Sequence, residues 1–211
     1  MEDRAITMEW LLDNSDISSS VVSDALTDDD LLFRMQNDDE TAFQMLVERH
    51  IDRAHGLALR ILKNQADAED VTQDVFVKTW TNRMSWQPGR ARFSTWLYRV
   101  IVNRCIDLRR APVNEDLENI PEPADDASSA EDLIQQSQVH LQVEKAISRL
   151  PTQQRAAIVL SYYEELSNAQ VAEIMGTTID AIESLLKRGR QKLREYLRHS
   201  SRDLGHRVVA R

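Results

Sequence analysis

The stretch that decides the fold is LSNAQVAEIMGTTIDAIESLLKRGRQKLREYL, residues 166–197. Ser167 is placed to cap a short helix, because its hydroxyl can accept a hydrogen bond from an N–H of the first turn. Gly176 supplies a tight turn, and Thr177 or Thr178 then caps a second helix. The apolar inner faces are Val171, Ile174 and Met175 in the first helix, and Ile182, Leu185 or Leu186, and Leu193 in the second. This order of elements predicts a helix-turn-helix.

The second helix carries the charge that DNA binding requires. Residues 178–211 hold nine Lys or Arg and four acidic residues. A cluster within about two turns can neutralise phosphates along a major groove. Its members are Lys187, Arg188, Arg190, Lys192 and Arg194. The alternative is a basic helix face that serves only solubility, but the preceding capped helix and glycine turn favour DNA binding.

Two acidic residues, Asp180 and Glu183, lie near the start of this second helix. An acid there could accept a hydrogen bond from a cytosine amino group. It could equally repel phosphate and restrict which sites are tolerated.

A second basic region lies upstream, where residues 83–110 hold seven arginines and one acid, Asp107. Aromatic residues are interleaved with the arginines: Trp86, Phe93, Trp96 and Tyr98 alternate with Arg90, Arg92, Arg99 and Arg104. Arginines can follow a nucleic-acid backbone while aromatic faces stack on unpaired bases. The loop 82–92 is therefore a candidate pocket for an extruded base. We expect Phe93 to belong to the core, and Trp96 fits either role.

The segment DAEDVTQDVFVKTW, residues 67–80, predicts a helix with one acidic face. That face consists of Asp67, Glu69, Asp70, Gln73 and Asp74, beside Val71 and Phe76. An acidic face with exposed apolar residues would suit docking onto a basic protein surface. Simple solvation of a helix with acids in its first turn is the alternative.

The remaining periodicity is helical throughout, so we predict an all-α protein with two small helical domains joined by a flexible acidic linker. Thr27 followed by three aspartates starts one helix, and apolar steps of three and four from Phe43 to Leu62 predict a long one. A cap at Ser94 or its neighbour starts a helix that Pro112 ends. Pro151 is expected in the first turn of another.

The net charge of −9 conceals two basic bodies. Residues 1–30 and residues 111–138 each carry a net charge of −8, which leaves +7 on the remainder. We expect 1–27 to be a disordered acidic tail, and 112–138 to be a linker whose last part, from about Ala130, begins the next helix. The domains then span 28–111 and 139–199, with a basic tail at 200–211.

Several classes of protein fit the sequence poorly. Cys105 is the only cysteine and lies in an apolar helical stretch, so an inert core thiol is favoured over redox sensing. The five histidines are scattered, and we find no nucleotide-binding loop, catalytic triad or metal cluster; we expect no cofactor and no enzyme activity. No apolar run suits a membrane span and the N-terminus lacks a secretory pattern, which predicts a cytoplasmic protein.

Together these motifs resemble the extracytoplasmic-function (ECF) sigma factors of bacterial RNA polymerase, over about residues 28–198 without most of the linker. DAEDVTQDVFVKTW resembles the segment that binds core polymerase. FSTWLYRVIVNRCIDLRR resembles the helix that melts and reads the −10 element. RLPTQQRAAIVLSYYEELSNAQVAEIMGTT resembles the start of the domain that reads the −35 element.

The resemblance implies a role for individual residues. Core polymerase would be bound by Asp70, Gln73, Asp74 and Phe76. The −10 element would be bound by Arg90, Arg92, Trp96, Arg99 and Asn103, and the −35 element by Thr178, Ser184, Lys187, Arg188 and Arg190. Glu183 and Leu185 depart from the family, which often has basic residues there, and this puts the −35 sequence in doubt.

The partners implied are core RNA polymerase, promoter DNA and an anti-sigma factor, in a chain that takes no small-molecule substrate and does not insert into a membrane. Two alternatives remain open: a stand-alone helix-turn-helix regulator, which would leave the acidic face at 67–80 unused, and a helical adaptor that binds only proteins, such as a regulator of polymerase.

Overall fold

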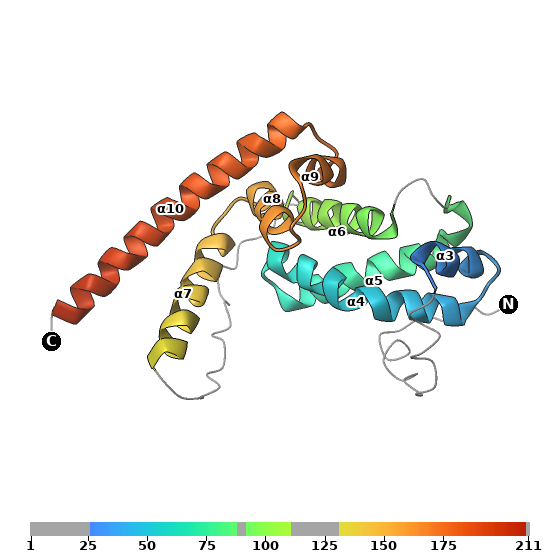
Figure 1. Cartoon of the computed structure of the whole chain (residues 1–211), viewed down its shortest axis with the longest axis horizontal. Helices are drawn as coiled ribbons and strands as arrows, with labels where there is room; N and C mark the ends of the chain where they lie inside the picture. Colours follow the sequence, from blue (N-terminus) through green and yellow to red (C-terminus); the bar gives the residue numbers. More distant parts are fainter. Residues whose placement is uncertain (1–25, 88–91, 111–130, 210–211) are drawn as a thin grey trace. The chain divides into compact units, whose positions relative to one another are not determined.

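The computed structural model describes residues 26–87, 92–110 and 131–209, and the regular structure of these residues is entirely helical (Figure 1). The chain divides into an N-terminal unit that holds α3 to α5 and most of α6, and a C-terminal unit that holds α7, α8, most of α9 and α10. The prediction of an all-α protein with two helical bodies is confirmed. The predicted N-terminal tail lies outside the described residues, as does most of the predicted linker.

The N-terminal unit begins with α3 (Asp28–Gln36), at the position the sequence predicts. The Thr27 hydroxyl accepts a hydrogen bond from the Asp30 N–H at 3.2 Å, and the Asp30 carboxylate accepts one from the Thr27 N–H at 2.9 Å. This capping box satisfies two N–H groups that have no partner within the helix and stabilises it by about 1 kcal/mol. α3 packs on α4 and buries Leu31, Leu32 and Met35.

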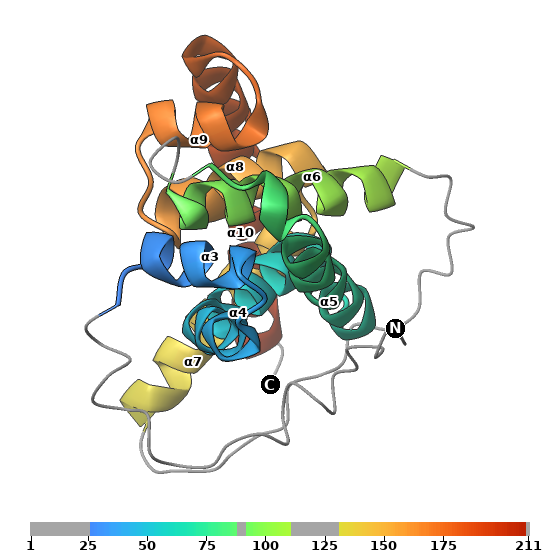
Figure 2. The same ribbon diagram turned by 90° about the vertical axis from the view of Figure 1, so that its right-hand side faces the viewer.

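The next two helices, α4 (Glu40–Leu62) and α5 (Gln65–Thr81), form a hairpin and lie side by side (Figure 2). Asp39 caps α4, and Asn64 caps α5 by accepting from the Asp67 N–H at 3.0 Å. Lys63 takes a left-handed conformation with φ of 57°, which ends α4 and reverses the chain within two residues. Because the reversal is tight, the apolar faces of the two helices meet and form the core of the unit.

A 3₁₀ turn, η1 (Arg83–Ser85), and α6 (Phe93–Arg110) complete the N-terminal unit. Phe93 is 1% exposed and is already helical, so Ser94 lies inside the first turn. The predicted cap at this position is wrong, because burial of Phe93 places the helix start earlier in the chain. α6 ends two residues before Pro112, and Cys105 is buried on its inner face, as expected for a core thiol.

The C-terminal unit contains α7 (Glu131–Ser148), α8 (Thr152–Tyr162), α9 (Asn168–Met175) and α10 (Ile179–Val209). α7 begins inside the predicted linker, close to the position expected for a helix start. Pro151 immediately precedes α8, with ψ of 142°, so its predicted place within the first turn is off by one residue. α10 packs against both α7 and α8.

A buried arginine closes the turn between α7 and α8. Arg155 is 9% exposed and donates hydrogen bonds to carbonyl oxygens in the last turn of α7 and just after it. The acceptors are Ile147 at 3.2 Å, Ser148 at 2.5 Å and Leu150 at 2.9 Å. Desolvation by burial lowers the pKa of Arg155 to about 10. A charge is therefore held in the core, where it donates to carbonyl groups at the end of α7 and just after it; one of these, Ile147, also accepts a hydrogen bond from the Leu150 N–H at 3.1 Å.

Candidate nucleic-acid interface

The acidic face of α5 consists, as predicted, of Asp67, Glu69, Asp70, Gln73 and Asp74. Asp70 and Glu69 are exposed, and the other three are partly exposed. Asp74 does not stand alone, because its carboxylate lies 3.2 Å from the guanidinium of Arg104 on α6. The face can meet a basic partner, and it is joined to α6 by this ion pair.

The apolar residues of the same helix lie elsewhere. Val71 and Phe76 are each 1% exposed and belong to the core formed with α4. The expectation that they flank the acidic face as exposed apolar contacts is wrong, and Phe76 is not available to touch a partner directly. The reason is that α5 needs an apolar stripe to pack in the hairpin, and these residues supply it.

Three aromatic rings form a cluster at the start of α6. Trp86 meets Phe93 and Trp96 edge-on, with ring centroids 5.7 Å and 5.6 Å apart. Phe93 stacks on Trp96 at 5.7 Å. Phe93 is buried, as expected, whereas Trp86 and Trp96 are partly exposed and can offer ring surface to a ligand. The sequence named Trp86 among the aromatic residues of this region and Trp96 as a site residue; the contact between their rings depends on the fold.

The segment that carries Trp86 is held in place by residues far away in the sequence. The side-chain amide of Gln36, in α3, donates to the carbonyl oxygens of Trp86 at 2.7 Å and Arg83 at 3.3 Å. Arg83 forms an ion pair with Asp38 and lies over the ring of Trp80, 4.3 Å from its centroid. α3 therefore braces residues 83–86, the first part of the loop 82–92, a role that no local sequence signal reveals.

One face of α6 gathers the polar residues predicted to contact the −10 element. Trp96, Arg99 and Asn103 follow helical spacing, and Arg99 and Asn103 are exposed. Arg92 immediately precedes the helix and is exposed as well. Arg90 lies outside the described residues. Four of the five predicted residues thus lie along one end and one face of α6.

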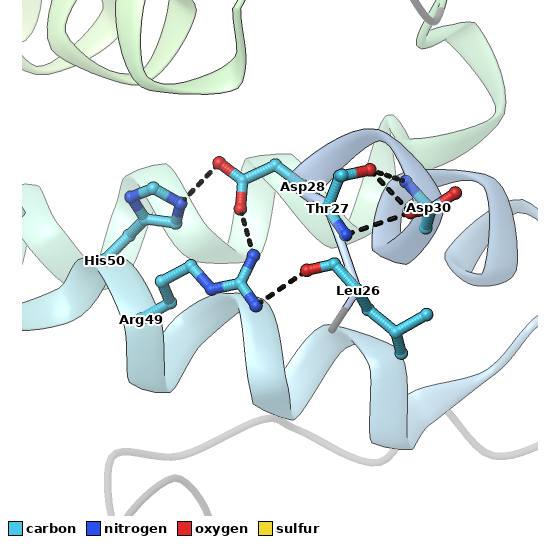
Figure 3. A network of polar contacts seen from close by, with 6 residues as sticks. All are labelled: Leu26, Thr27, Asp28, Asp30, Arg49 and His50. Carbon is cyan, nitrogen blue, oxygen red and sulfur yellow. Dashed lines mark hydrogen bonds and ion pairs between the residues drawn. The ribbon is translucent and has the colours of Figure 1, made fainter. Parts of the chain in front are cut away.

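A polar network joins the start of α3 to α4 (Figure 3). The Asp28 carboxylate accepts from Arg49 at 2.6 Å and lies 2.8 Å from Nε2 of His50. Arg49 also donates to the carbonyl oxygen of Leu26 at 3.0 Å. His50 is 8% exposed and meets the ring of Phe93 edge-on at 5.1 Å. The start of α3 is thereby connected through α4 to the first residue of α6.

The C-terminal unit contains the predicted helix-turn-helix, formed by α9 and α10. Ser167 caps α9 reciprocally with Gln170, whose carboxamide accepts from the Ser167 N–H at 2.9 Å. Gly176 adopts φ of 63°, the left-handed conformation that the turn requires. Thr178 caps α10 by accepting from the Ala181 N–H at 3.2 Å. These local predictions are confirmed.

The outward face of α10 carries the predicted polar residues. Ile182 and Leu186 are buried, while Leu185 is partly exposed. The exposed residues are Thr178, Asp180, Glu183, Ser184, Lys187, Arg188 and Arg190. Both acids therefore share the exposed surface with the bases. Arg188 donates to the carbonyl oxygen of Ser184 at 3.2 Å, which lays its side chain along the helix.

Comparison with known families agrees with this division. The model of Sigma-70 region 2 matches residues 46–112, and the model of Sigma-70, region 4 matches residues 140–193. The ECF RNA polymerase sigma factor SigE of Mycolicibacterium smegmatis is 34% identical over 199 residues, which cover 92% of this chain and 73% of that protein. The chain belongs to the ECF RNA polymerase sigma factors. Sigma factors are initiation factors that bind core RNA polymerase and direct it to promoter DNA.

Other ECF sigma factors show the same relationship. SigW of Bacillus subtilis is 31% identical over 176 residues, covering 78% of this chain and 94% of SigW. The solved structure of CnrH in complex with the cytosolic domain of CnrY matches 82% of this chain and 97% of CnrH, with a TM-score of 0.60 and 25% identity. The solved structure of the sigma factor RpoE in complex with the anti-sigma factor NepR, from Bartonella quintana, is also similar. The match covers 74% of this chain and 96% of RpoE, with a TM-score of 0.57 and 25% identity.

Within this sigma factor, the brace formed by α3 lies ahead of the residues that the region 2 model matches. Among the described residues, we find no cluster of His, Cys, Asp and Glu that could hold a metal ion, and no helix long and apolar enough to cross a bilayer.

Proposed function

We propose that this sigma factor divides promoter recognition between its two units and binds polymerase through a third surface. The observation that carries the proposal is the pairing of chemistries within one chain: an arginine and tryptophan surface on α6, and a helix-turn-helix with an exposed basic face on α10. The domain bounds we propose are 28–111 for region 2 and 139–199 for region 4.

The N-terminal unit is proposed to melt and read the −10 element. Arg90, Arg92 and Arg99 follow the backbone of the separated strand, because guanidinium groups neutralise phosphates without regard to sequence. Trp96 stacks on an unpaired base, and Asn103 offers an amide that can both donate and accept hydrogen bonds. The partial exposure of Trp96 and the exposed positions of Arg99 and Asn103 support these roles.

The C-terminal unit is proposed to read the −35 element through α10. Ser184, Lys187 and Arg188 face the major groove, and Thr178 and Arg190 contact its borders. Asp180 and Glu183 limit the −35 sequences that α10 can bind. Their carboxylates are repelled by phosphates and by the hydrogen-bond acceptor atoms of guanine.

Core polymerase is proposed to bind the acidic face of α5. Asp70, Gln73 and Asp74 make the contact, and Phe76 supports them from the core. The catalytic chemistry belongs to polymerase, so the chain acts as an initiation factor and not as an enzyme, needs no cofactor, and works in the cytoplasm, where polymerase and DNA are present.

An anti-sigma factor is a further proposed partner. The RpoE of Bartonella quintana was solved in complex with the anti-sigma factor NepR, and it shares the fold of this chain. A partner of this kind would act by covering the acidic face of α5 and the basic face of α10.

Promoter binding with and without core polymerase tests the proposal. Two DNA-binding units that each bind weakly and are joined by a linker gain affinity when polymerase fixes the distance between them. We therefore expect tight, sequence-specific binding only from the mixture, and a Lys187→Ala, Arg188→Ala variant that still binds polymerase but no longer responds to the −35 sequence. Tight specific binding by the free chain would favour the stand-alone regulator, and absence of DNA binding from every mixture would favour the adaptor.

A further inference from the structure

A tyrosine outside the helix-turn-helix lies beside the basic helix. Tyr162 ends α8, and its side chain is 54% exposed, unusually open for a large apolar ring. Its hydroxyl oxygen accepts a hydrogen bond at 3.1 Å from Nη1 of Arg190, which is exposed on α10. The ring does not contribute to the core, so burial does not explain its position.

The approach of these two side chains depends on a glycine. Gly189 is buried in the middle of α10, and a Cβ atom at this position would lie 3.2 Å from Cγ1 of Ile158 on α8. The two helices are therefore in close contact at Gly189, where a side chain would crowd Ile158. Arg190 follows Gly189 directly, and Tyr162 lies one turn beyond Ile158 on the same side of α8.

The position of Arg190 on the helix indicates what it can touch. Ile182, Leu186 and Gly189 form the buried line of α10. Arg190 lies next to this line, at the border of the exposed face, whereas Ser184 lies farther around the helix. Residues at the border of a recognition helix reach the phosphates that flank the groove, while base edges are reached from its centre.

We propose that Tyr162 and Arg190 together bind one phosphate of the −35 element, as a clamp built from two helices. This inference rests on the proposed role of α10 in reading that element. A tyrosine hydroxyl that accepts from a guanidinium still has its own proton to donate. Tyr162 therefore offers this O–H to a phosphate oxygen, and Arg190 offers its remaining N–H groups and its positive charge to the same phosphate.

The neighbouring tyrosine provides a matched control. Tyr163 is partly buried, and its hydroxyl donates to the Glu144 carboxylate at 2.6 Å, which ties α8 to α7. Tyr163→Phe removes a hydroxyl from the adjacent position without touching α10. Any change in DNA affinity caused by Tyr163→Phe therefore measures the effect of losing a tyrosine hydroxyl that only supports the fold of this unit.

The experiment measures binding of the polymerase holoenzyme to promoter DNA that carries a neutral methylphosphonate at one −35 phosphate at a time. With unmodified DNA, we expect Tyr162→Phe to weaken binding about 3- to 10-fold, the range of a hydrogen bond to a charged group. Arg190→Ala should weaken it further and lower the slope of log affinity against log salt by about 0.9. One methylphosphonate position should weaken the wild type strongly and both variants much less, while Tyr163→Phe stays as sensitive as the wild type.

Two results would overturn the clamp. One is an unchanged affinity of Tyr162→Phe holoenzyme for unmodified promoter DNA; the other is that Tyr162→Phe and Arg190→Ala lose their sensitivity to methylphosphonate at different phosphates. The Lys187→Ala, Arg188→Ala variant separates this failure from failure of the proposed function. If that variant loses the −35 response and Tyr162→Phe does not, only the clamp is wrong; if neither loses it, α10 does not read the −35 element.

Discussion

Arg104 of α6 lies 3.2 Å from Asp74 of α5, so the acidic face of α5 and the helix proposed to read the −10 element are joined by an ion pair. Both side chains are nearly half exposed, at 43% and 48%. An exposed pair stabilises a fold by at most about 1 kcal/mol. Its interest lies in its position, because a partner that binds Asp74 also acts on a contact of α6.

Charge exchange at this pair separates the two roles of Asp74. Asp74→Arg should weaken the binding of core polymerase at least about tenfold, because a cation replaces an anion at a charged interface. It should also lower the melting temperature slightly through repulsion with Arg104. Adding Arg104→Asp should restore the melting temperature but not polymerase binding, as measured by calorimetry and by fluorescence anisotropy. Recovery of polymerase binding in the double variant would show that Asp74 acts only within the chain.

Removal of the brace in α3 should impair promoter melting. Gln36→Ala removes the donor to the Trp86 and Arg83 carbonyl oxygens, a loss of about 1 kcal/mol. We expect fewer open complexes at the −10 element, measured by permanganate reactivity of unpaired thymines, with polymerase binding unchanged. Gln44→Ala is the control, because the Gln44 amide bonds to Glu48 on the same helix. Equal amounts of open complex formed with Gln36→Ala and with Gln44→Ala would contradict a role for the brace.

The network around Asp28 predicts a dependence of stability on pH. Partial burial raises the pKa of Asp28, but hydrogen bonds with His50 and Arg49 outweigh burial and leave the pKa below its usual value. Such a carboxylate stabilises the fold above its unfolded pKa of about 3.9, and the contribution is lost as the pH falls through the lower folded pKa.

Asp28→Asn should therefore lower the stability of the N-terminal unit by about 1 kcal/mol at pH 7, and the difference from the wild type should shrink below about pH 4. Thermal melting followed by circular dichroism at several pH values measures this. Asp52→Asn, at an exposed position of α4, is the control and should change little. A difference that is constant from pH 7 to pH 3 would exclude the ionised carboxylate as its source.

Loss of the buried arginine should destabilise the C-terminal unit. Arg155→Met fills part of the space but leaves the carbonyl groups of Ile147, Ser148 and Leu150 without its hydrogen bonds. We expect a loss of about 2 kcal/mol, measured by urea unfolding, because losing the hydrogen bonds to Ser148 and Leu150 costs more than removing the buried charge returns, while Ile147 keeps its bond from the Leu150 N–H. Lys145→Met, at an exposed position of α7, is the control. Stability equal to that of the wild type would mean that water replaces the guanidinium.

Local features of the fold could be predicted from the sequence because short-range chemistry determines them. Thr27, Ser167 and Thr178 precede helices whose first N–H groups they satisfy, and Gly176 takes the conformation that its turn needs. The cap near Ser94 was predicted too late, since the burial of Phe93 outweighed a local preference.

Contacts between distant residues could not be predicted in the same way. Nothing near Gln36 indicates that it holds Trp86, 50 residues away. Phe76 looked available on α5 because a helical pattern does not show which apolar residues pack in a hairpin. Tyr162 and Arg190 lie on different helices, and their contact follows from the packing of α8 on α10, which is close at Gly189.

Transcription from a defined promoter tests the central claim most directly: one chain presents two separate nucleic-acid surfaces that polymerase holds in register. Core polymerase is incubated with the chain and a template whose −10 or −35 element is intact, replaced or moved by half a helical turn. We expect RNA with one defined 5′ end only when the chain, core polymerase and both correctly spaced elements are present. Initiation that ignores the spacing, or that never depends on the added chain, would contradict the account.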